Sequence, residues 1–123
     1  MIDHMSIHVS DLDRSIAFYK AALAPLGYEL VMQFPGVAGF GEGGNTDFWL
    51  GAGGPVSSTN HVAFHARTRK LVDAFHAAAL AAGGKDNGAP GVRAMYHPDY
   101  YGAFVHDPDG HNIEAVCHEA YLG

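Results

Sequence analysis

Two stretches of this chain are similar enough to be copies of one unit. When residues 2–27 are shifted by 57 positions onto residues 59–84, nine of the 26 compared positions are identical. The identical pairs are His4/His61, His8/His65, Ala17/Ala74, Phe18/Phe75, Ala21/Ala78, Ala22/Ala79, Leu23/Leu80, Ala24/Ala81 and Gly27/Gly84. A repeat of this kind predicts a fold built from two similar units. It also predicts that two pairs of histidines occupy equivalent positions.

The bulk composition is that of a globular protein with one core. The chain has 123 residues, of which 48% are hydrophobic and 16% are charged. This composition is too apolar for a disordered chain and sufficient for a single core. We therefore expect one domain over residues 1–123, with a first module at about 1–54 and a second at about 59–118. The Gly-rich segment 51–58 is expected to be a flexible joint between them.

Charge and cysteine content argue against several classes of protein. The formal net charge is −6, and the basic residues form no cluster beyond residues 67–70, so no nucleic-acid partner is expected. Cys117 is the one cysteine and cannot form a disulfide within the chain. No apolar run approaches the roughly 18 residues of a membrane span, and the first residues lack a secretory leader. We therefore expect a cytoplasmic protein without a membrane partner.

The spacing of apolar residues predicts the elements of the first unit. Alternation over residues 2–9 predicts a strand that carries His4, Ser6 and His8 on one face. Apolar residues at helical spacing follow, between an N-cap at residues 10–11 and Pro25, which ends the helix. Three further strands are expected at 28–34, 37–41 and 47–50.

The second unit repeats this order. A strand is expected over 61–66, then a helix that Thr68 caps and that ends at residues 83–84. A loop over 88–93 is expected to lead into a strand near 92–96, before two strands at 100–106 and 112–118. Each unit is therefore strand–helix–strand–strand–strand, which gives an α+β fold. Two such βαβββ modules side by side are expected to form a partly open β-barrel, with helices outside and a cleft within.

Histidines and one glutamate are the candidate metal ligands. His4 and His61 begin the first strands of the two modules, and Glu114 lies in the last strand of the second. Two imidazoles and a carboxylate leave coordination positions open for a substrate. His8 and His65 are the alternative pair, since four residues of strand span about 13 Å and one strand cannot supply both histidines. A structural role for the histidines, and a salt bridge or a protonated acid for Glu114, remain the alternatives.

Tyrosines near His97 are candidates for moving a proton or orienting a substrate oxygen. Alternation places Tyr101 on one strand face and Tyr100 on the other, together with Phe104. The sequence does not indicate which face is solvated, and packing of these rings in the core or at its rim is the alternative. His111, beside the turn at residues 107–110, is expected to be exposed, as is His106, and Cys117 is expected to be packed.

Three segments together form a recognisable pattern. They are His4 with residues 9–19 (VSDLDRSIAFY), residues 60–64 (NHVAF) and residues 104–114 (FVHDPDGHNIE). In combination they resemble the vicinal oxygen chelate superfamily, which contains glyoxalase I, extradiol dioxygenases, fosfomycin-resistance proteins and bleomycin-resistance proteins. The resemblance spans nearly the whole chain. It implies paired βαβββ modules with metal ligands at His4, His61 and Glu114.

One position departs from the pattern of the members with four ligands. Those members carry a further ligand in the last strand of the first module, where this chain has Trp49. Tryptophan cannot ligate a metal, and Asp47 lies two residues away. The departure argues against glyoxalase I chemistry and leaves a site of two histidines and one carboxylate, similar to the dioxygenase branch.

The resemblance implies a metal-dependent enzyme, a dioxygenase or a lyase, that acts on a small oxygen-bearing substrate. The substrate would be chelated by a divalent metal: Fe(II), Zn, Mn, Ni or Mg. Tyr101 or His65 would assist proton transfer. The pocket would be lined by Trp49, His8, Tyr96 and Phe104. Because modules of this kind often pair between chains, a homodimer is expected, with the cleft either within one chain or across two. The alternative is a protein that sequesters a small aromatic molecule without metal catalysis, as bleomycin-resistance proteins do.

Overall fold

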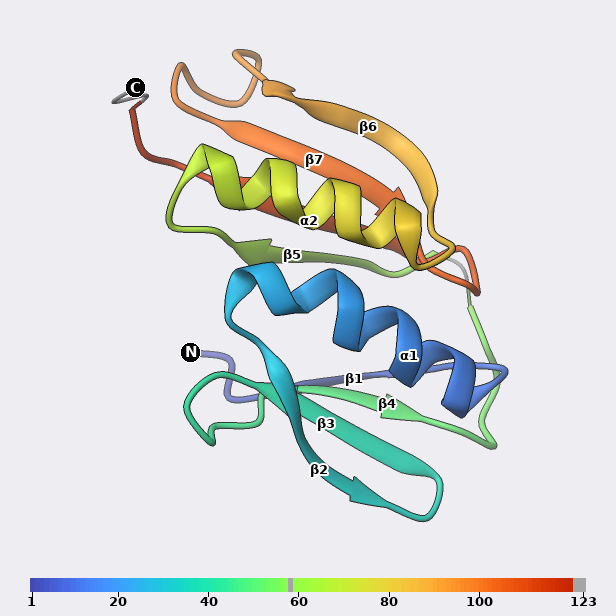
Figure 1. Cartoon of the computed structure of the whole chain (residues 1–123). Helices are drawn as coiled ribbons and strands as arrows, with labels where there is room; N and C mark the ends of the chain where they lie inside the picture. The colour runs from blue at the N-terminus through green and yellow to red at the C-terminus, as the bar shows by residue number, and fades with distance from the viewer. Residues whose placement is uncertain (58, 121–123) are drawn as a thin grey trace.

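The computed structural model describes residues 1–57 and 59–120. Residue 58 of the expected joint and the last three residues of the expected domain therefore lie outside the described residues. Within the described part, the chain forms two α-helices, one 3-10 turn and two four-stranded mixed sheets (Figure 1). Each half of the chain supplies one helix and one sheet in the order strand–helix–three strands. The predicted α+β class and the two βαβββ modules are thus confirmed.

The first module forms a sheet in the order β1-β4-β3-β2. Its elements are β1 (Met5–His8), α1 (Leu12–Leu23), η1 (Ala24–Leu26), β2 (Glu29–Phe34), β3 (Val37–Gly41) and β4 (Phe48–Gly51). Strand β1 runs parallel to β4, whereas the other neighbours are antiparallel. Gly27 ends η1 with a φ of 86°, a left-handed conformation that glycine adopts without strain.

The second module repeats this arrangement in the order β5-β8-β7-β6. Its elements are β5 (His61–His65), α2 (Arg69–Ala81), β6 (Lys85–Val92), β7 (Tyr101–His106) and β8 (Asn112–Cys117). The predicted loop over 88–93 and strand near 92–96 are wrong, because β6 ends at Val92. Register shifts between Asp86, Gly88 and Gly91 let the strand pass through residues that are typical of a loop.

Both helices begin at side-chain caps within the predicted segments. Asp11 accepts a hydrogen bond from the backbone N–H of Arg14 at 3.1 Å, and Thr68 accepts one from Leu71 at 3.2 Å. Each cap satisfies an N–H group that has no partner inside its helix. The local sequence therefore fixes where each helix starts.

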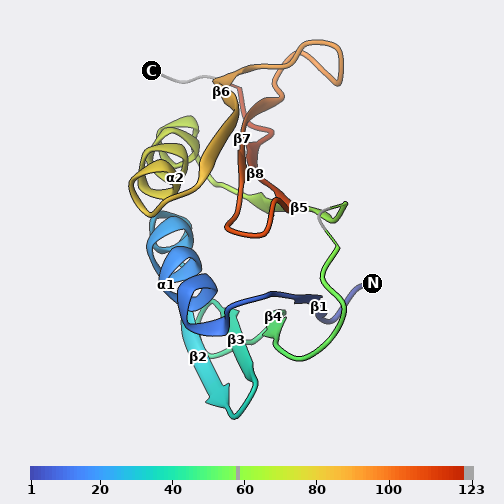
Figure 2. The same cartoon turned by 90° about the vertical axis from the view of Figure 1, so that its right-hand side faces the viewer.

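One hydrophobic core joins the two modules. Both helices lie side by side on the same side of the two sheets (Figure 2). Phe64 of β5 packs edge-on against Phe48 of β4, with ring centroids 5.2 Å apart, and against Tyr28 at 5.4 Å. The apolar faces of both sheets and helices belong to this single cluster of buried residues. The core therefore sets how the modules sit relative to each other.

The face of each sheet opposite its helix carries the candidate site residues. On β5, Val62 and Phe64 are buried, while His61, Ala63 and His65 are exposed. We call the face that His61 and His65 share the open face of the second sheet. Among the described residues, no strand of one sheet pairs with a strand of the other, so there is no closed barrel. In the same part of the chain, no helix combines the length and apolarity that crossing a membrane requires.

Candidate functional site

A buried carboxylate and an imidazole meet on the open face of the second sheet. Glu114 Oε1 lies 2.9 Å from His61 Nε2. The Glu114 side chain is 2% exposed and that of His61 is 48% exposed, so one partner is buried and the other reaches solvent. A buried carboxylate is costly unless its oxygens have partners. The second oxygen, Oε2, accepts a hydrogen bond from the hydroxyl of Tyr100.

Tyr100 and Tyr101 point to opposite faces of the second sheet. Burial and the bond to Glu114 raise the pKa of Tyr100 well above its ordinary value, so at neutral pH the hydroxyl keeps its proton and donates. Tyr101 instead packs against the core and donates to Asp73 of α2 at 2.6 Å. Burial and that bond raise the pKa of Tyr101 to about 12. The hydroxyl beside Glu114 is therefore that of Tyr100, and Tyr101 faces the helix.

The strand register identifies the counterpart of Glu114 in the first module. Ala63 of β5 is opposite Glu114, and Ser6 of β1 is opposite Trp49. Because Ser6 and Ala63 are equivalent in the repeat, Trp49 occupies the position that Glu114 has in the second sheet. A Cβ added to Gly39 would lie 2.9 Å from the Trp49 ring, so the indole covers the backbone of β3.

His4, the third candidate ligand, is not grouped with His61 and Glu114. It precedes β1, is exposed, and its Nδ1 lies 2.8 Å from Asp3 Oδ1. No three His, Cys, Asp or Glu side chains lie close enough to hold a metal ion among residues 1–57 and 59–120. The donor types of His61 and Glu114 suit a divalent metal. One chain thus brings together two of the three donors that the sequence predicts.

Three further histidines of the second module, His65, His97 and His118, form a stack beside the site. His118 stacks on His65 with ring centroids 6.1 Å apart and on His97 at 5.0 Å. His97 Nε2 also lies 2.8 Å from His118 Nδ1. The Tyr100 ring meets both His97 and His118 edge-on. This stack supports the ring whose hydroxyl contacts Glu114.

The predicted pocket residues are divided between the two modules. Phe104 lies on the open face of the second sheet, 6.1 Å from the His61 ring. Tyr96 is 62% exposed and its ring centroid lies 4.8 Å from that of Tyr100. His8 belongs to the first module, where its Nδ1 lies 3.2 Å from the carbonyl oxygen of Pro55. Tyr96 and Phe104 are thus near Glu114, whereas His8 packs against the joint between the modules.

The turn at residues 107–110 connects the modules. Asp107 is buried and accepts a hydrogen bond from Tyr19 of α1 at 2.5 Å. Asp109 accepts hydrogen bonds from the backbone N–H and the hydroxyl of Ser10, the latter at 2.5 Å. His111 was expected to be exposed, and this is wrong: it is fully buried, with Nε2 3.1 Å from the His8 carbonyl oxygen. The turn brings His111 into the junction, where this carbonyl offers it a partner.

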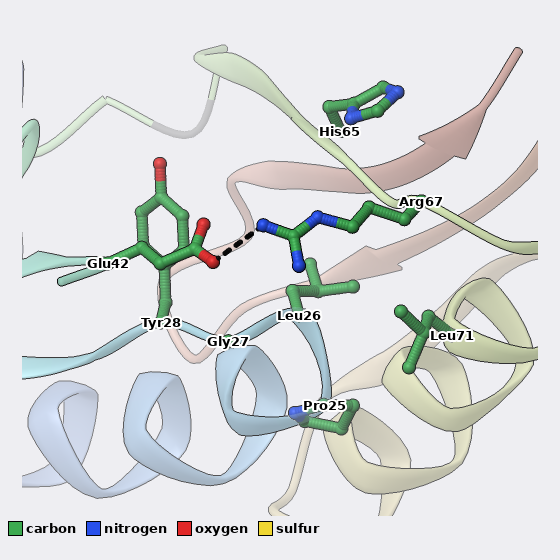
Figure 3. Close-up of a pocket in the computed structure, with 8 residues that line it drawn as sticks. All are labelled: Pro25, Leu26, Gly27, Tyr28, Glu42, His65, Arg67 and Leu71. Carbon is green, nitrogen blue, oxygen red and sulfur yellow. Dashed lines mark hydrogen bonds and ion pairs between the residues drawn. The ribbon is translucent and has the colours of Figure 1, made fainter.

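Among the cavities formed by the described residues, two lie between the modules, and neither of these two contains the Glu114–His61 pair. The larger, of about 310 Å³, is crossed by an ion pair of 2.9 Å between Arg67 and Glu42 (Figure 3). Its lining residues are Pro25, Leu26, Gly27, Tyr28, Glu42, His65, Arg67 and Leu71. The smaller, of about 190 Å³, lies between β1 and β5. His65 lines both cavities, so it stands between them and the open face.

Sequence reasoning missed three residues near Glu114. Tyr100 was one of the candidate tyrosines, but Tyr101 and His65 were preferred for proton transfer, and neither His118 nor Arg93 was predicted to belong to the site. The alternation did group Tyr100 with Phe104, and both have the parity that faces away from α2 in the structure. The sequence did not indicate which face of the strand the helix covers. Arg93 follows a strand whose end was predicted wrongly, so its direction could not be inferred.

Comparisons with known proteins give consistent matches. A family model described as the Glyoxalase/Bleomycin resistance protein/Dioxygenase superfamily matches residues 1–115. A glyoxalase/bleomycin resistance protein from Albidiferax ferrireducens T118 has a TM-score of 0.82 at 30% identity, over 94% of this chain and 97% of that chain. A putative glyoxalase from Bacillus halodurans has a TM-score of 0.73 at 25% identity, over 95% of each chain.

A more distant structure shares the fold alone. The fosfomycin resistance protein FosX from Listeria monocytogenes, solved as a mutant with Mn(II), has a TM-score of 0.70 at 19% identity. The match covers 94% of this chain and 88% of that chain. No curated protein sequence matches the chain.

Proposed function

The chain belongs to the glyoxalase/bleomycin resistance protein/dioxygenase superfamily, and on that premise we propose that it is a metal-dependent enzyme acting on a small oxygen-bearing substrate. The observation that carries the proposal is the contact between the buried Glu114 carboxylate and the His61 imidazole. His61 reaches solvent on that sheet face, so a substrate can approach the pair from its side. The dioxygenase branch is the reaction type that we favour.

His61 and Glu114 would hold the metal, which would supply a Lewis acid or a platform for O₂. The His61 nitrogen that faces Glu114 must be free of its proton to act as a ligand. Loading is therefore expected to release a proton. Tyr100 would keep one carboxylate oxygen occupied and so orient the other toward the metal.

His4 would be the third ligand, supplied by a second copy of the chain. In the described residues, β1 pairs with β4 alone and β5 pairs with β8 alone, so each strand has one free edge. His4 and His61 lie at equivalent ends of these two edge strands. A homodimer that sets β1 of one copy beside β5 of the other would bring the histidines together. We propose this arrangement because one chain does not assemble all three donors.

The surroundings of Glu114 indicate which residues would contact a substrate. Phe104 and Tyr96 offer apolar ring surface beside His61, and Trp49 would close the opposite wall if a second copy contributes its first sheet. His65 would assist proton transfer, since it is exposed on the same strand face as His61. Tyr101 is less suited to that task than Tyr100, because its hydroxyl is held by Asp73.

Metal binding tests the proposal directly. Purified protein is depleted of metal and titrated with Fe(II), Mn(II), Ni(II), Zn(II) or Mg(II), and the bound metal is measured by elemental analysis. We expect one ion per chain, and a loss of affinity of about 100-fold or more in His61→Ala and Glu114→Gln. His76→Ala is the matched control, because His76 forms a similar contact with Asp86, at 3.0 Å, away from the site. If Glu114→Gln held metal at the wild-type level, the ligand assignment would be abandoned.

A metal-free binding protein is the second candidate function. The absence of a three-donor group within the described residues favours it, and the exposed ring of Tyr96 beside Tyr100 and Phe104 offers a surface for an aromatic ligand. Tight binding of an aromatic compound by protein that takes up none of the five metals would support this function over catalysis. Turnover that depends on an added metal would support the enzyme.

A further inference from the structure

Arg93 lies beside the Glu114–His61 pair, and no carboxylate among residues 1–57 and 59–120 forms an ion pair with it. Its backbone N–H donates to the Tyr100 carbonyl oxygen at 2.7 Å, which places it directly after β6 and opposite Tyr100. The side chain is partly buried, and its guanidinium carbon lies 5.5 Å from the centre of the Phe104 ring. Phe104 in turn lies 6.1 Å from the His61 ring. A cation is therefore held one aromatic ring away from the candidate metal ligands.

Glycines let Arg93 and Glu114 pack against the backbone of β6 and β7. A Cβ at Gly91 would lie 3.0 Å from Arg93 Nη1, and one at Gly88 would lie 3.3 Å from Nη2. A Cβ at Gly102 would lie 3.2 Å from Glu114 Oε2. Side chains at these three positions would therefore displace the guanidinium or the carboxylate, and their absence keeps both groups close to the strands.

The hydrogen-bonding capacity of Arg93 is mostly unused. A guanidinium has five N–H groups, and within residues 1–57 and 59–120 one acceptor is bonded, the Ala89 carbonyl oxygen at 2.7 Å. No Asp or Glu of the described residues lies within ion-pair distance of Arg93, although the chain has 13 acidic and seven basic residues. Arg67 and Arg69, by contrast, each face a carboxylate. The contact with the Phe104 ring occupies none of the N–H groups, so donors are left for an external acceptor.

We propose that Arg93 binds an oxyanion of the substrate, so that the substrate is a small anionic molecule carrying a carboxylate or a phosphoryl group. A planar guanidinium matches either anion with two parallel hydrogen bonds. The substrate would place its anion on Arg93 and its apolar part against Phe104. The inference rests on the proposed function only for the identity of the site, because anion binding by Arg93 requires no metal.

The test uses metal-free, full-length protein and three probes: benzoate, the uncharged benzamide, and inorganic phosphate. Calorimetric titration gives the affinity for each. We expect at least one anion to bind about 10-fold more tightly than benzamide, and Arg93→Gln to weaken that anion by about 10-fold or more. The tighter of benzoate and phosphate indicates whether the substrate carries a carboxylate or a phosphoryl group. Arg14→Gln, an exposed arginine on α1, is the matched control and should leave all affinities unchanged.

Three results would overturn the inference. They are an unchanged anion affinity in Arg93→Gln, benzamide bound as tightly as the tighter of the two anions, and no anion bound by the wild type. If Arg93→Gln does not fold, anion affinity is measured in Arg93→Lys instead. The wild type is also titrated with the anion while the NMR signal of the Arg93 side chain is followed. The outcome is separate from the metal test. Loss of anion binding in Arg93→Gln would uphold the inference even in a protein that takes up no metal.

Discussion

At the scale of single residues, two adjacent tyrosines differ in what their hydroxyls do. Tyr100 donates to Glu114 on the open face, whereas Tyr101 donates to Asp73 beside the core. Each substitution to phenylalanine removes one oxygen and changes nothing else in composition. Comparison of Tyr100→Phe with Tyr101→Phe therefore separates an effect on the candidate site from a general effect on the fold.

We predict that Tyr100→Phe weakens metal binding by about 10-fold, because Glu114 loses the donor that orients it. Tyr101→Phe should leave metal affinity within about 2-fold of the wild type, since its hydroxyl contacts no candidate ligand. Metal titration of both variants measures the difference, and their thermal melting temperatures check the fold. Equal affinities in the two variants would show that Tyr100 does not position the carboxylate.

Tyr101 also predicts how stability depends on alkaline pH. In the unfolded chain a tyrosine loses its proton near pH 10, whereas burial and the bond to Asp73 raise the pKa of Tyr101 to about 12 in the fold. The folded state therefore holds more protons than the unfolded state between these values, so stability falls as pH rises through this window.

In Tyr101→Phe that contribution is absent, and the stability difference from the wild type should be constant below about pH 10 and shrink above it. Urea unfolding of both proteins at several pH values measures this difference. A gap that stays constant up to pH 12 would mean that the Tyr101 proton is not coupled to folding.

At the scale of elements, the turn between β7 and β8 stabilises the junction of the modules. Asp107 accepts hydrogen bonds from Tyr19 and from the backbone N–H groups of Asp109 and His111, and both Asp107 and Tyr19 are buried. Loss of one partner leaves a buried polar group unsatisfied.

Asp107→Ala should therefore lower the free energy of unfolding by about 3 kcal/mol, and Tyr19→Phe by about 1–2 kcal/mol. The double variant should cost less than the sum, because the two changes remove the same hydrogen bond. Urea unfolding measures all three. Ser10→Ala is the control at the same junction, since its contact with Asp109 is exposed and should be worth less than about 1 kcal/mol. Additive effects of the two substitutions would indicate that Tyr19 and Asp107 do not act together.

The elements that the sequence predicted well are those with local causes. The repeat and the capping residues Asp11 and Thr68 predicted both helices and the order of strands. β6 was missed because Pro90 and its neighbouring glycines are typical of a loop, and an edge strand with shifted register tolerates them. The burial of His111 depends on an acceptor more than a hundred residues away, the His8 carbonyl. No local pattern contains that contact.

The candidate site was predicted in the same uneven way. Glu114 and His61 could be chosen because a repeat and a motif point to them, and the structure brings them together. Tyr100 could be placed on the same strand face as Phe104, but the choice of face depends on where α2 packs. The role of Arg93 depends on glycines in β6 and β7. It also depends on the lack of an Asp or Glu within ion-pair distance of its guanidinium among the described residues. These are properties of packing that a single sequence does not contain.

At the scale of the whole molecule, the two modules present their uncovered faces separately. Both helices and the inner faces of the sheets share one core. His4 and Trp49 belong to one module and His61 and Glu114 to the other. In the proposed homodimer a second copy supplies His4 and Trp49, so assembly and metal binding should depend on each other.

Mixing two inactive variants tests this coupling. His4→Ala and Glu114→Gln should each bind metal weakly as pure dimers. After the two are unfolded together and refolded, a mixed dimer contains one intact site, with His4 from one copy and His61 and Glu114 from the other. With random assembly, half of all dimers are mixed, and each mixed dimer has one of its two sites intact. Metal binding should therefore recover to about a quarter of the wild-type level.

His61→Ala mixed with Glu114→Gln is the control. Both substitutions fall in the same module, so every site in a mixed dimer keeps at least one of them. Recovery in the control would contradict the ligand set, and no recovery in the test mixture, with dimers confirmed by light scattering, would show that His4 does not reach a partner's site.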